Sequence, residues 1–231
     1  CREECRLSLS FNPNWTSTVL PIVEQNGNIK IGGTEGETVE YALKMENMPE
    51  QWLLSGLLEN GAVSENNMTS IAGRLSEIHS SNPAKDKAAE SGKAESFRAL
   101  CDDMLFQMKR YFDASLTQPI LDMIRHPLEK FIDQNKRLFS KRHQKGRIVH
   151  GHGAFLPEHI FVSDKVVRFI SPQEVHRKLA DLDVANDVSS LTVELARLGK
   201  HDLVETFLNH YLEISNDQDL HKMLPLYQCI L

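Results

Sequence analysis

The hydrophobic repeat of this chain changes its period once, close to residue 49. Before that point lie three short segments rich in branched side chains, at residues 19–23, 28–33 and 38–45. Asn26-Gly27 separates the first two segments and predicts a tight hairpin, because both residues tolerate a positive φ. After Met48-Pro49, apolar residues recur three and four positions apart, which is typical of helices that bury one face. The sequence therefore predicts an α+β, mainly α, fold with a small antiparallel sheet at residues 19–45.

The remaining elements follow from the same patterns. Residues 1–11 read as the back end of a helix that stops at an Asn-Pro-Asn cluster. Residues 82–96 contain no large apolar side chain, so we expect a mobile, solvated connection there. Two long amphipathic helices are expected next, and Pro127 should interrupt or kink the second one. A short hairpin around Ser163-Asp164-Lys165 and three further helices complete the prediction.

Charge and composition exclude several classes of partner. The net charge of −6 gives no concentrated positive surface for a nucleic-acid backbone. No run approaches the ~20 apolar residues that span a bilayer, and no charged and apolar leader opens the sequence. The four cysteines lack the paired spacing of a zinc site and are too few to staple a chain of this size. We expect a cytoplasmic protein that contacts neither nucleic acid nor membrane.

The stretch VHGHGAFLPEHIFV, at residues 149–162, carries three histidines in a turn-rich loop. His150, His152 and His159 could converge on a transition metal, with Glu158 or His176 as a further ligand, because imidazole is a common metal ligand. In the other interpretation, His152 bonds the backbone of its own loop, and His150 and His159 are partly exposed. The spacing alone leaves both interpretations open.

Four segments of the chain carry a resemblance to a known family. These are VEYALKMENMP at 39–49, HGHGAFLPEHIFV at 150–162, LDVANDVSSL at 182–191 and FLNHYLEIS at 207–215. In this order they resemble the aminoglycoside phosphotransferase-like branch of the protein-kinase-like fold, in particular a bacterial group often fused to a P-loop ATPase domain. The resemblance implies a truncated, small antiparallel N-lobe at residues 1–46 and a helical C-lobe at residues 47–231, with the catalytic loop at residues 150–160.

The catalytic loop departs from the family pattern. In the family it reads His-Gly-Asp-x-His-x-x-Asn, where the aspartate orients the attacking hydroxyl and the asparagine holds magnesium. His152 and Gly153 keep the first two positions. Ala154 stands at the aspartate position, Leu156 at the second histidine and His159 at the asparagine. The resemblance therefore implies a degenerate loop.

The family's second metal-binding aspartate is also absent, because its position falls on Ile170 or Ser171. The resemblance further implies that Asp183 and Asp187 are structural, supporting the loop and capping a helix. The family's phosphate-pairing lysine lies upstream of residue 1, and Lys44 is a poor substitute on the hinge-side strand. Phosphoryl transfer depends on magnesium and cationic groups to neutralise charge, so we predict a catalytically inactive pseudo-phosphotransferase.

Such a domain is expected to act as a binding or regulatory module without a bound cofactor. A protein or small-molecule ligand would occupy the cleft between the two lobes. The candidate hinge contacts are Lys44, Met45, Glu46 and Met48. Trp15 and Trp52 could add to these contacts or could pack the two lobes together.

Two alternatives remain beside this prediction. The first is an active small-molecule phosphotransferase that uses ATP and Mg²⁺, with Glu158 or His159 as the base and Glu174 as a metal ligand. The second is a histidine-rich metal-binding domain built on His150, His152 and His159.

Overall fold

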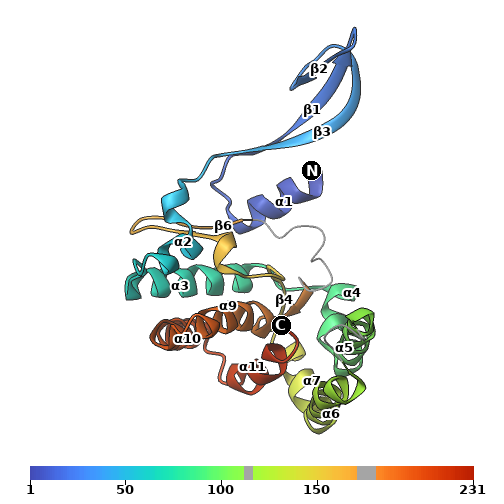
Figure 1. Ribbon diagram of the computed structural model, residues 1–231, viewed down its shortest axis with the longest axis vertical. Helices are drawn as coiled ribbons and strands as arrows, with labels where there is room; N and C mark the ends of the chain where they lie inside the picture. The colour runs from blue at the N-terminus through green and yellow to red at the C-terminus, as the bar shows by residue number, and fades with distance from the viewer. Residues whose placement is uncertain (112–116, 171–180) are drawn as a thin grey trace.

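A sheet arm projects from a mainly helical body in the computed structural model of the chain (Figure 1). The structure describes residues 1–111, 117–170 and 181–231, apart from the side chains of Glu3 and Leu7. The prediction of an α+β, mainly helical fold with small antiparallel sheets is confirmed. None of the helices in the described ranges is long and apolar enough to cross a membrane.

The arm consists of three antiparallel strands that follow an N-terminal helix. The elements are α1 (Arg2–Phe11), β1 (Ser17–Gln25), β2 (Asn28–Ile31) and β3 (Glu37–Met45). The strand order is β2-β1-β3, so β1 is central and the other two strands form the edges. Asn26 and Gly27 both have positive φ, at 54° and 77°, and they make the predicted hairpin turn. A bulge beside Ile22 and Val23 bends the arm.

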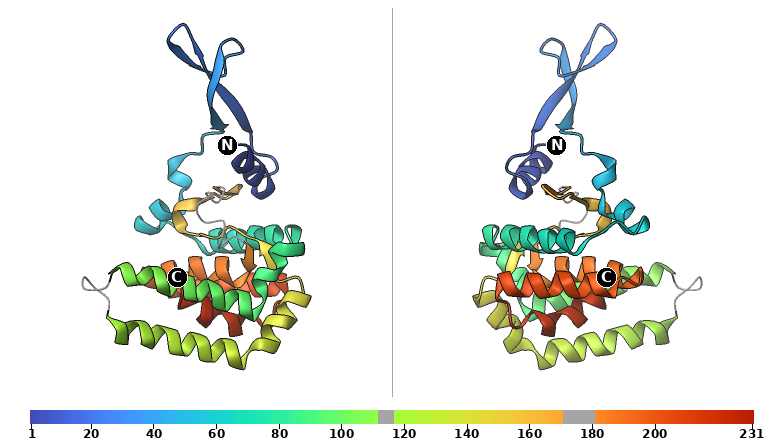
Figure 2. Two further views of the ribbon diagram at one scale, coloured as in Figure 1. Left: turned by 90° about the vertical axis from the view of Figure 1, so that its right-hand side faces the viewer. Right: turned by 90° about the vertical axis from the view of Figure 1, so that its left-hand side faces the viewer.

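The body consists of helices with two small sheets among them (Figure 2). Its first helices are η1 (Glu50–Trp52), α2 (Leu54–Glu59), α3 (Glu65–Ser81), α4 (Asp86–Ala89), η2 (Glu90–Gly92), α5 (Ala94–Met108) and η3 (Lys109–Tyr111). The later ones are α6 (Gln118–Gln134), α7 (Lys136–Gln144), η4 (Pro157–His159), α9 (Ala185–Arg197), α10 (His201–Ser215) and α11 (Leu220–Gln228). The strands are β4 (Ile148–His150), β5 (Ile160–Val162), β6 (Val167–Phe169) and β7 (Asp181–Asp183). β4 pairs with β7, and β5 pairs with β6 as the expected second hairpin.

The core of the body forms where α10 packs against α3 and α9. Met68, Ile71 and Leu75 are fully buried on α3, spaced three and four apart as a one-faced helix requires. Ser64 begins this helix with a capping box: its hydroxyl accepts the Asn67 N–H, and the Asn67 side-chain oxygen accepts the Ser64 N–H. α3 and α9, which belong to this core, carry the two side chains, His79 and Asp187, that meet beside the histidine-containing loop.

Much of residues 82–96, expected to be a mobile, solvated connection, adopts secondary structure in the described chain. The segment forms α4 and η2 and enters α5, and Gly92 is buried against Ile148, where a Cβ would meet the isoleucine side chain at 2.2 Å. The Ser91 hydroxyl donates to the carbonyl of Asp181, and the Ala84 N–H donates to the carbonyl of Ile148. Small residues here let the backbone approach β4 and β7 closely, so no large apolar side chain is needed.

Pro127 does not interrupt its helix. α6 runs through it from Gln118 to Gln134, and the break falls at Asn135, which leads into α7. A proline interior to a helix removes one intrahelical bond, and this helix tolerates that loss.

Candidate functional site

The histidine-containing loop connects β4 to η4 and is fixed at its start by the pairing of β4 with β7. Gly153 has φ of 79°, a conformation in which an L side chain is strained, so the glycine is required by the backbone. The loop is closely packed: His152 and Phe155 are buried, and the ring of Phe155 meets that of Phe169 at 4.8 Å between centroids. The loop therefore has a defined backbone path.

A buried carboxylate on α9 holds that path. Asp187 accepts the backbone N–H of His152 at 2.6 Å and that of Gly153 at 2.8 Å. His79 on α3 lies 3.1 Å from the same carboxylate through Nε2, and its Nδ1 lies 2.7 Å from the hydroxyl of Tyr211. Burial by itself raises the pKa of Asp187, but the bonds and charges of His79 and His152 outweigh it, so that pKa lies below the ordinary value. The ionised carboxylate thus ties α3, α9 and the loop together.

His152 connects the loop to the end of β6. Its Nε2 lies 2.5 Å from the carbonyl oxygen of Ile170, so the nitrogen donates there. Burial lowers the pKa of His152 to about 4, because the charged ring would lose its water; this leaves the imidazole neutral at physiological pH. The ring meets Phe11 edge-on and stacks on His159 at 5.3 Å between centroids.

Asn12, at the end of α1, holds the same strand from the other side. Its side-chain amide donates to the carbonyl of Phe169 at 2.7 Å, and its oxygen accepts the Phe169 N–H at 3.3 Å. This buried contact spans 157 residues of sequence, and no local pattern could have revealed it. It fixes α1 and the base of the arm to the loop region.

The positions at which the resembled family carries metal-binding groups lie close together around this loop. Ala154 offers a methyl group, and its carbonyl oxygen lies 2.8 Å from Nδ1 of His159. One ring nitrogen of His159 is therefore already hydrogen-bonded within its own loop. Ile170 offers an aliphatic side chain, whereas Ser171 lies outside the described residues. Oxygen ligands are what Mg²⁺ prefers, and none of the three described side chains supplies one.

The structure gives little support to Glu158 and Glu174, the carboxylates that an active phosphotransferase would need at this loop. Glu158 is exposed on η4. Glu174 and His176 both lie outside the described residues. An exposed carboxylate in the single-turn η4 has no backbone network comparable to that of Asp187 to orient it.

The three histidines are not brought together as a metal site. His150 bonds Asp181 through Nδ1 at 2.5 Å, as a cross-strand pair of β4 and β7, and about half of its side chain is exposed. His152 and His159 instead stack on each other. Within the described ranges, no group of three or more His, Cys, Asp and Glu side chains is arranged to hold a metal ion.

Asp183 belongs to a buried ion cluster that sequence reasoning missed. Arg142 on α7 is fully buried and makes bidentate contacts with Asp183, at 2.5 and 2.7 Å, and with Asp217, at 2.8 Å to each oxygen. Asp183 also accepts the Ala185 N–H at 2.9 Å, at the start of α9. Burial lowers the pKa of Arg142, but the two carboxylates raise it above the ordinary value, so the guanidinium stays charged. The cluster orients the helix that carries Asp187.

The hinge candidates lie at the base of the arm. Lys44 and Met45 end β3 and are exposed, and the Glu46 N–H donates to the carbonyl of Thr16. Met48 is half-buried. Trp15 is 5% exposed and Trp52 is half-buried, so Trp15 packs the junction of arm and body and offers little surface to a ligand.

Comparison with known proteins gives distant relatives. No protein-family model matches the chain. Proteins of Mycobacterium tuberculosis and Mycobacterium bovis, each named only as an uncharacterized protein, are 24% identical to it over 191 residues. The match covers 83% of this chain and 38% of each relative, so the chain spans well under half of their length. Neither name states an activity, and the proposal below therefore rests on the site.

Proposed function

We propose that this chain is a kinase-like domain of the aminoglycoside phosphotransferase type that has lost catalysis and serves as a binding or regulatory module. The order of elements supports this: a small antiparallel sheet, a hinge, a helical body, a loop rich in glycine and histidine, a short hairpin and an aspartate-bearing helix. A fold alone specifies no activity, so the proposal depends on the loop.

The observation that carries the proposal is the contrast between how the loop is held and what it presents. Asp187 fixes the backbone at His152 and Gly153 with two short bonds, as a loop that positions reactive groups requires. Ala154, His159 and Ile170 then supply a methyl group, a ring bonded to its own loop and an aliphatic chain. Phosphoryl transfer is mostly positioning and neutralisation of charge by Mg²⁺. A scaffold without these oxygen ligands retains positioning alone.

The surface left for a ligand lies where the arm meets the body. Met45 and Met48 flank the hinge, and methionine side chains adapt to varied apolar partners. Lys44 and Glu46 add one charge of each sign. We therefore expect a protein segment or a small molecule with a mixed apolar and polar surface, and no divalent cation as an obligatory partner.

The test is an assay of ATP hydrolysis and of γ-phosphoryl transfer to water or to the chain itself, with Mg²⁺ and with Mn²⁺. We expect no turnover above the buffer blank. The Glu158→Gln and His159→Ala variants are assayed in parallel. Turnover that either variant abolishes would establish the active alternative and overturn the proposal. Turnover that persists equally in both variants and co-purifies with the chain through repeated chromatography would also contradict it, because it would require another site.

A further inference from the structure

A cavity of about 380 Å³ lies at the foot of the arm, where three segments meet. They are the turn between α1 and β1, the middle of α3, and strand β6 (Figures 1 and 2). A cavity of this volume can hold a small ligand, because ligand sites occupy about 300–1,000 Å³. Its lining residues belong neither to the hinge nor to the histidine-containing loop, so it is separate from both.

Arg74, on α3, forms one fixed wall of the cavity. Its Nη1 donates to the carboxylate of Glu77 at 2.6 Å, and its Nη2 donates to the carbonyl of Phe11 at 2.6 Å. These two bonds orient the guanidinium before a ligand arrives. Glu77 also lines the cavity, so the charge of Arg74 is already balanced there.

Arg168, on β6, is a second guanidinium that lines the cavity, and its charge is not balanced. Among the described residues it forms no ion pair with a carboxylate, and its Nη1 donates to the carbonyl of the preceding Val167 at 3.1 Å. The side chain is half-buried, so water reaches the guanidinium only in part. Its other N–H groups remain available as donors. A half-buried guanidinium with free donors is well suited to bind an oxyanion, because its planar fork matches two oxygens at once.

The charges and the apolar lining narrow the class of anion. Arg74, Arg168 and Glu77 together leave one positive charge, which a single carboxylate balances. A phosphate group carries about −1.5 to −2 charges at neutral pH and would add repulsion with Glu77. Pro13 and Val167 give the cavity an apolar wall. A carboxylate attached to a short apolar group therefore fits the cavity better than phosphate does.

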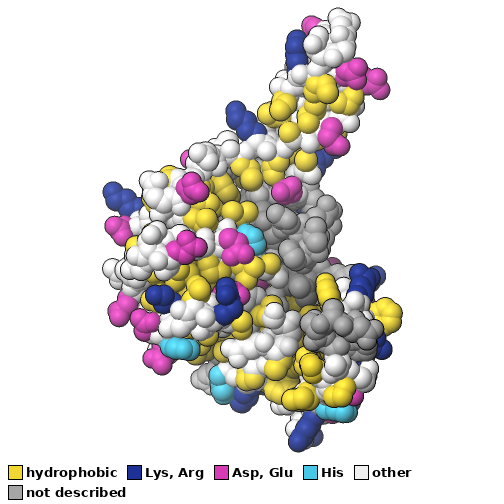
Figure 3. Space-filling model, in the orientation of Figure 1, with side chains coloured by type: hydrophobic (Ala, Val, Ile, Leu, Met, Phe, Trp, Pro, Cys, Tyr) yellow, Lys and Arg dark blue, Asp and Glu magenta, His cyan; other side chains and the backbone are white. Residues whose placement is uncertain are grey.

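The wider charge distribution favours a small anion over a polyanion. On the face shown in Figure 3, Lys and Arg side chains are interspersed with Asp and Glu and do not gather into one basic area. The net charge of the chain is −6. A nucleic acid needs a broad positive surface, whereas a small anion needs only one local cation in a cavity.

We propose that this cavity binds the carboxylate of a small organic acid. Arg168 is its main partner, Arg74 is the second cation, and the side-chain amide of the exposed Asn14 adds a donor at the rim. An ion pair on an open surface contributes little to binding, but a partly buried one is screened less by water and salt. The proposal goes beyond the binding module proposed above and does not depend on it, because it uses residues outside the hinge and the loop.

A ligand in this cavity would bind across the junction of arm and body. Asn14 lies in the turn that leads into β1, and Arg168 directly precedes Phe169, whose backbone is held by Asn12. The ligand would therefore add contacts beside the bonds between Asn12 and Phe169. Because these groups come together only in the folded chain, binding should raise the melting temperature.

The test is a titration of the purified chain with benzoate, followed by heteronuclear NMR of the arginine side-chain N–H groups and of the Asn14 amide. Benzoate carries one carboxylate on an apolar ring. Benzamide has nearly the same shape without the charge, and inorganic phosphate has the charge without the apolar group. We expect benzoate to shift the signals of Arg168 and Asn14 and to raise the melting temperature. Benzamide and phosphate should bind at least tenfold more weakly at the same ionic strength.

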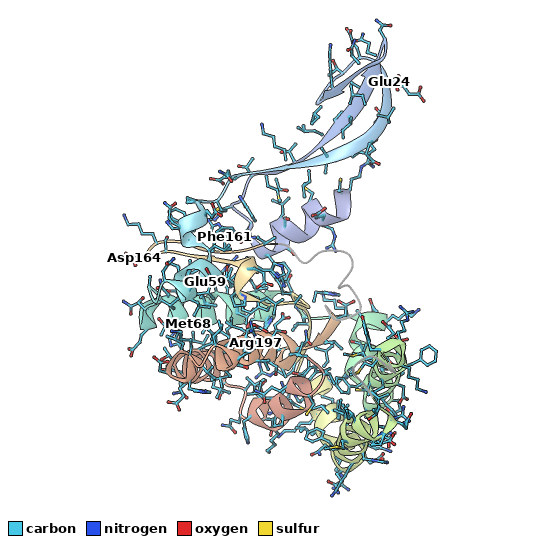
Figure 4. The ribbon with its side chains drawn as sticks, in the orientation of Figure 1. Glu24, Glu59, Met68, Phe161, Asp164 and Arg197 are labelled. Atoms are coloured by element: carbon cyan, nitrogen blue, oxygen red, sulfur yellow. The ribbon has the colours of Figure 1, made fainter. Side chains whose placement is uncertain are left out.

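Two variants with the same change of charge separate the cavity from the surface. Arg168→Gln should weaken benzoate binding at least tenfold while the circular dichroism spectrum stays unchanged, because Arg168 pairs with no carboxylate in the described chain. Lys165→Gln is the matched control: Lys165 is exposed in the turn of the same hairpin, next to Asp164 at its outer end (Figure 4). This control should bind benzoate like the parent chain. Glu77→Gln should strengthen phosphate binding, since it removes the repelling charge.

Several results would overturn the proposal. One is a benzoate titration that leaves the signals of Arg168 and Asn14 unchanged. Another is binding that survives Arg168→Gln, because another surface would then hold the carboxylate. Equal binding of benzamide would show that the charge is not recognised, and tighter binding of phosphate than of benzoate would contradict the assignment to carboxylates.

Discussion

Replacing Asp187 by alanine should destabilise the chain more than any other single change in the loop region. The carboxylate accepts three buried donors: the N–H groups of His152 and Gly153 and Nε2 of His79. A buried donor left without a partner costs ~1–3 kcal/mol, which sums to about 3–9 kcal/mol for three. We expect the lower half of that range, since the removed carboxylate leaves space for a water molecule between polar groups.

Urea unfolding followed by far-ultraviolet circular dichroism measures this loss. Asp181→Ala is the matched control, because Asp181 also bonds a histidine, His150, but in an exposed pair that contributes at most ~1 kcal/mol. Asp187→Asn should lie between the two, since one acceptor oxygen remains. If Asp187→Ala lost no more free energy of unfolding than Asp181→Ala, the claim that the carboxylate holds the loop would be refuted.

Three further predictions concern charge and packing. The pKa of His152 is about 4 in the folded chain and about 6.5 in the unfolded chain, so the unfolded state takes up the proton first as pH falls. The free energy of unfolding should therefore drop by about 3 kcal/mol between pH 6.5 and pH 4. His152→Gln should flatten this pH dependence in unfolding titrations. Arg142→Ala removes the cation shared by two buried carboxylates, of which Asp217 keeps, among the described residues, only Arg147 at 3.5 Å, and should cost ~3–5 kcal/mol by urea unfolding. Lys141→Ala should cost at most ~1 kcal/mol, because Lys141 is half exposed and its partner Asp219 keeps the ion pair with Lys222. Gly92→Ala should cost ~1–3 kcal/mol in thermal unfolding and be partly rescued by Ile148→Ala, while Gly56→Ala, with open space around it, should cost nothing.

The elements that could be predicted from sequence are those whose signals are local. Asn26-Gly27 fixed the arm's hairpin because the turn needs only those two residues, and the apolar spacing of α3 is visible within one helix. The helical structure within residues 82–96 was not predicted, because it packs through a glycine that lets β4 approach, and composition cannot show such a contact. The three-residue strands β4 and β7 are too short for a periodic signal.

The site residues also differ in how far the sequence could predict their contacts. The contacts of Asp187 and Asp183 were expected only through the family resemblance, since nothing in their own spacing identifies the backbone groups they accept. Arg142 was overlooked because it lies in a basic stretch, KRHQKGR at residues 141–147, and its carboxylate partners lie 41 and 75 residues away. The network around Arg142 and Asp187 could not be predicted, because its members lie far apart in the sequence.

A thermal-shift titration with ATP, with Mg²⁺ and with both together tests most directly whether the loop still holds a metal and a triphosphate. The account predicts the same melting temperature in all three conditions as in buffer. Ligand bound at a hundred times its Kd would stabilise the fold by ~2.7 kcal/mol, or about 5–10 °C for a chain of this size. A rise of that order that requires ATP and Mg²⁺ together, and that His159→Ala removes, would contradict it.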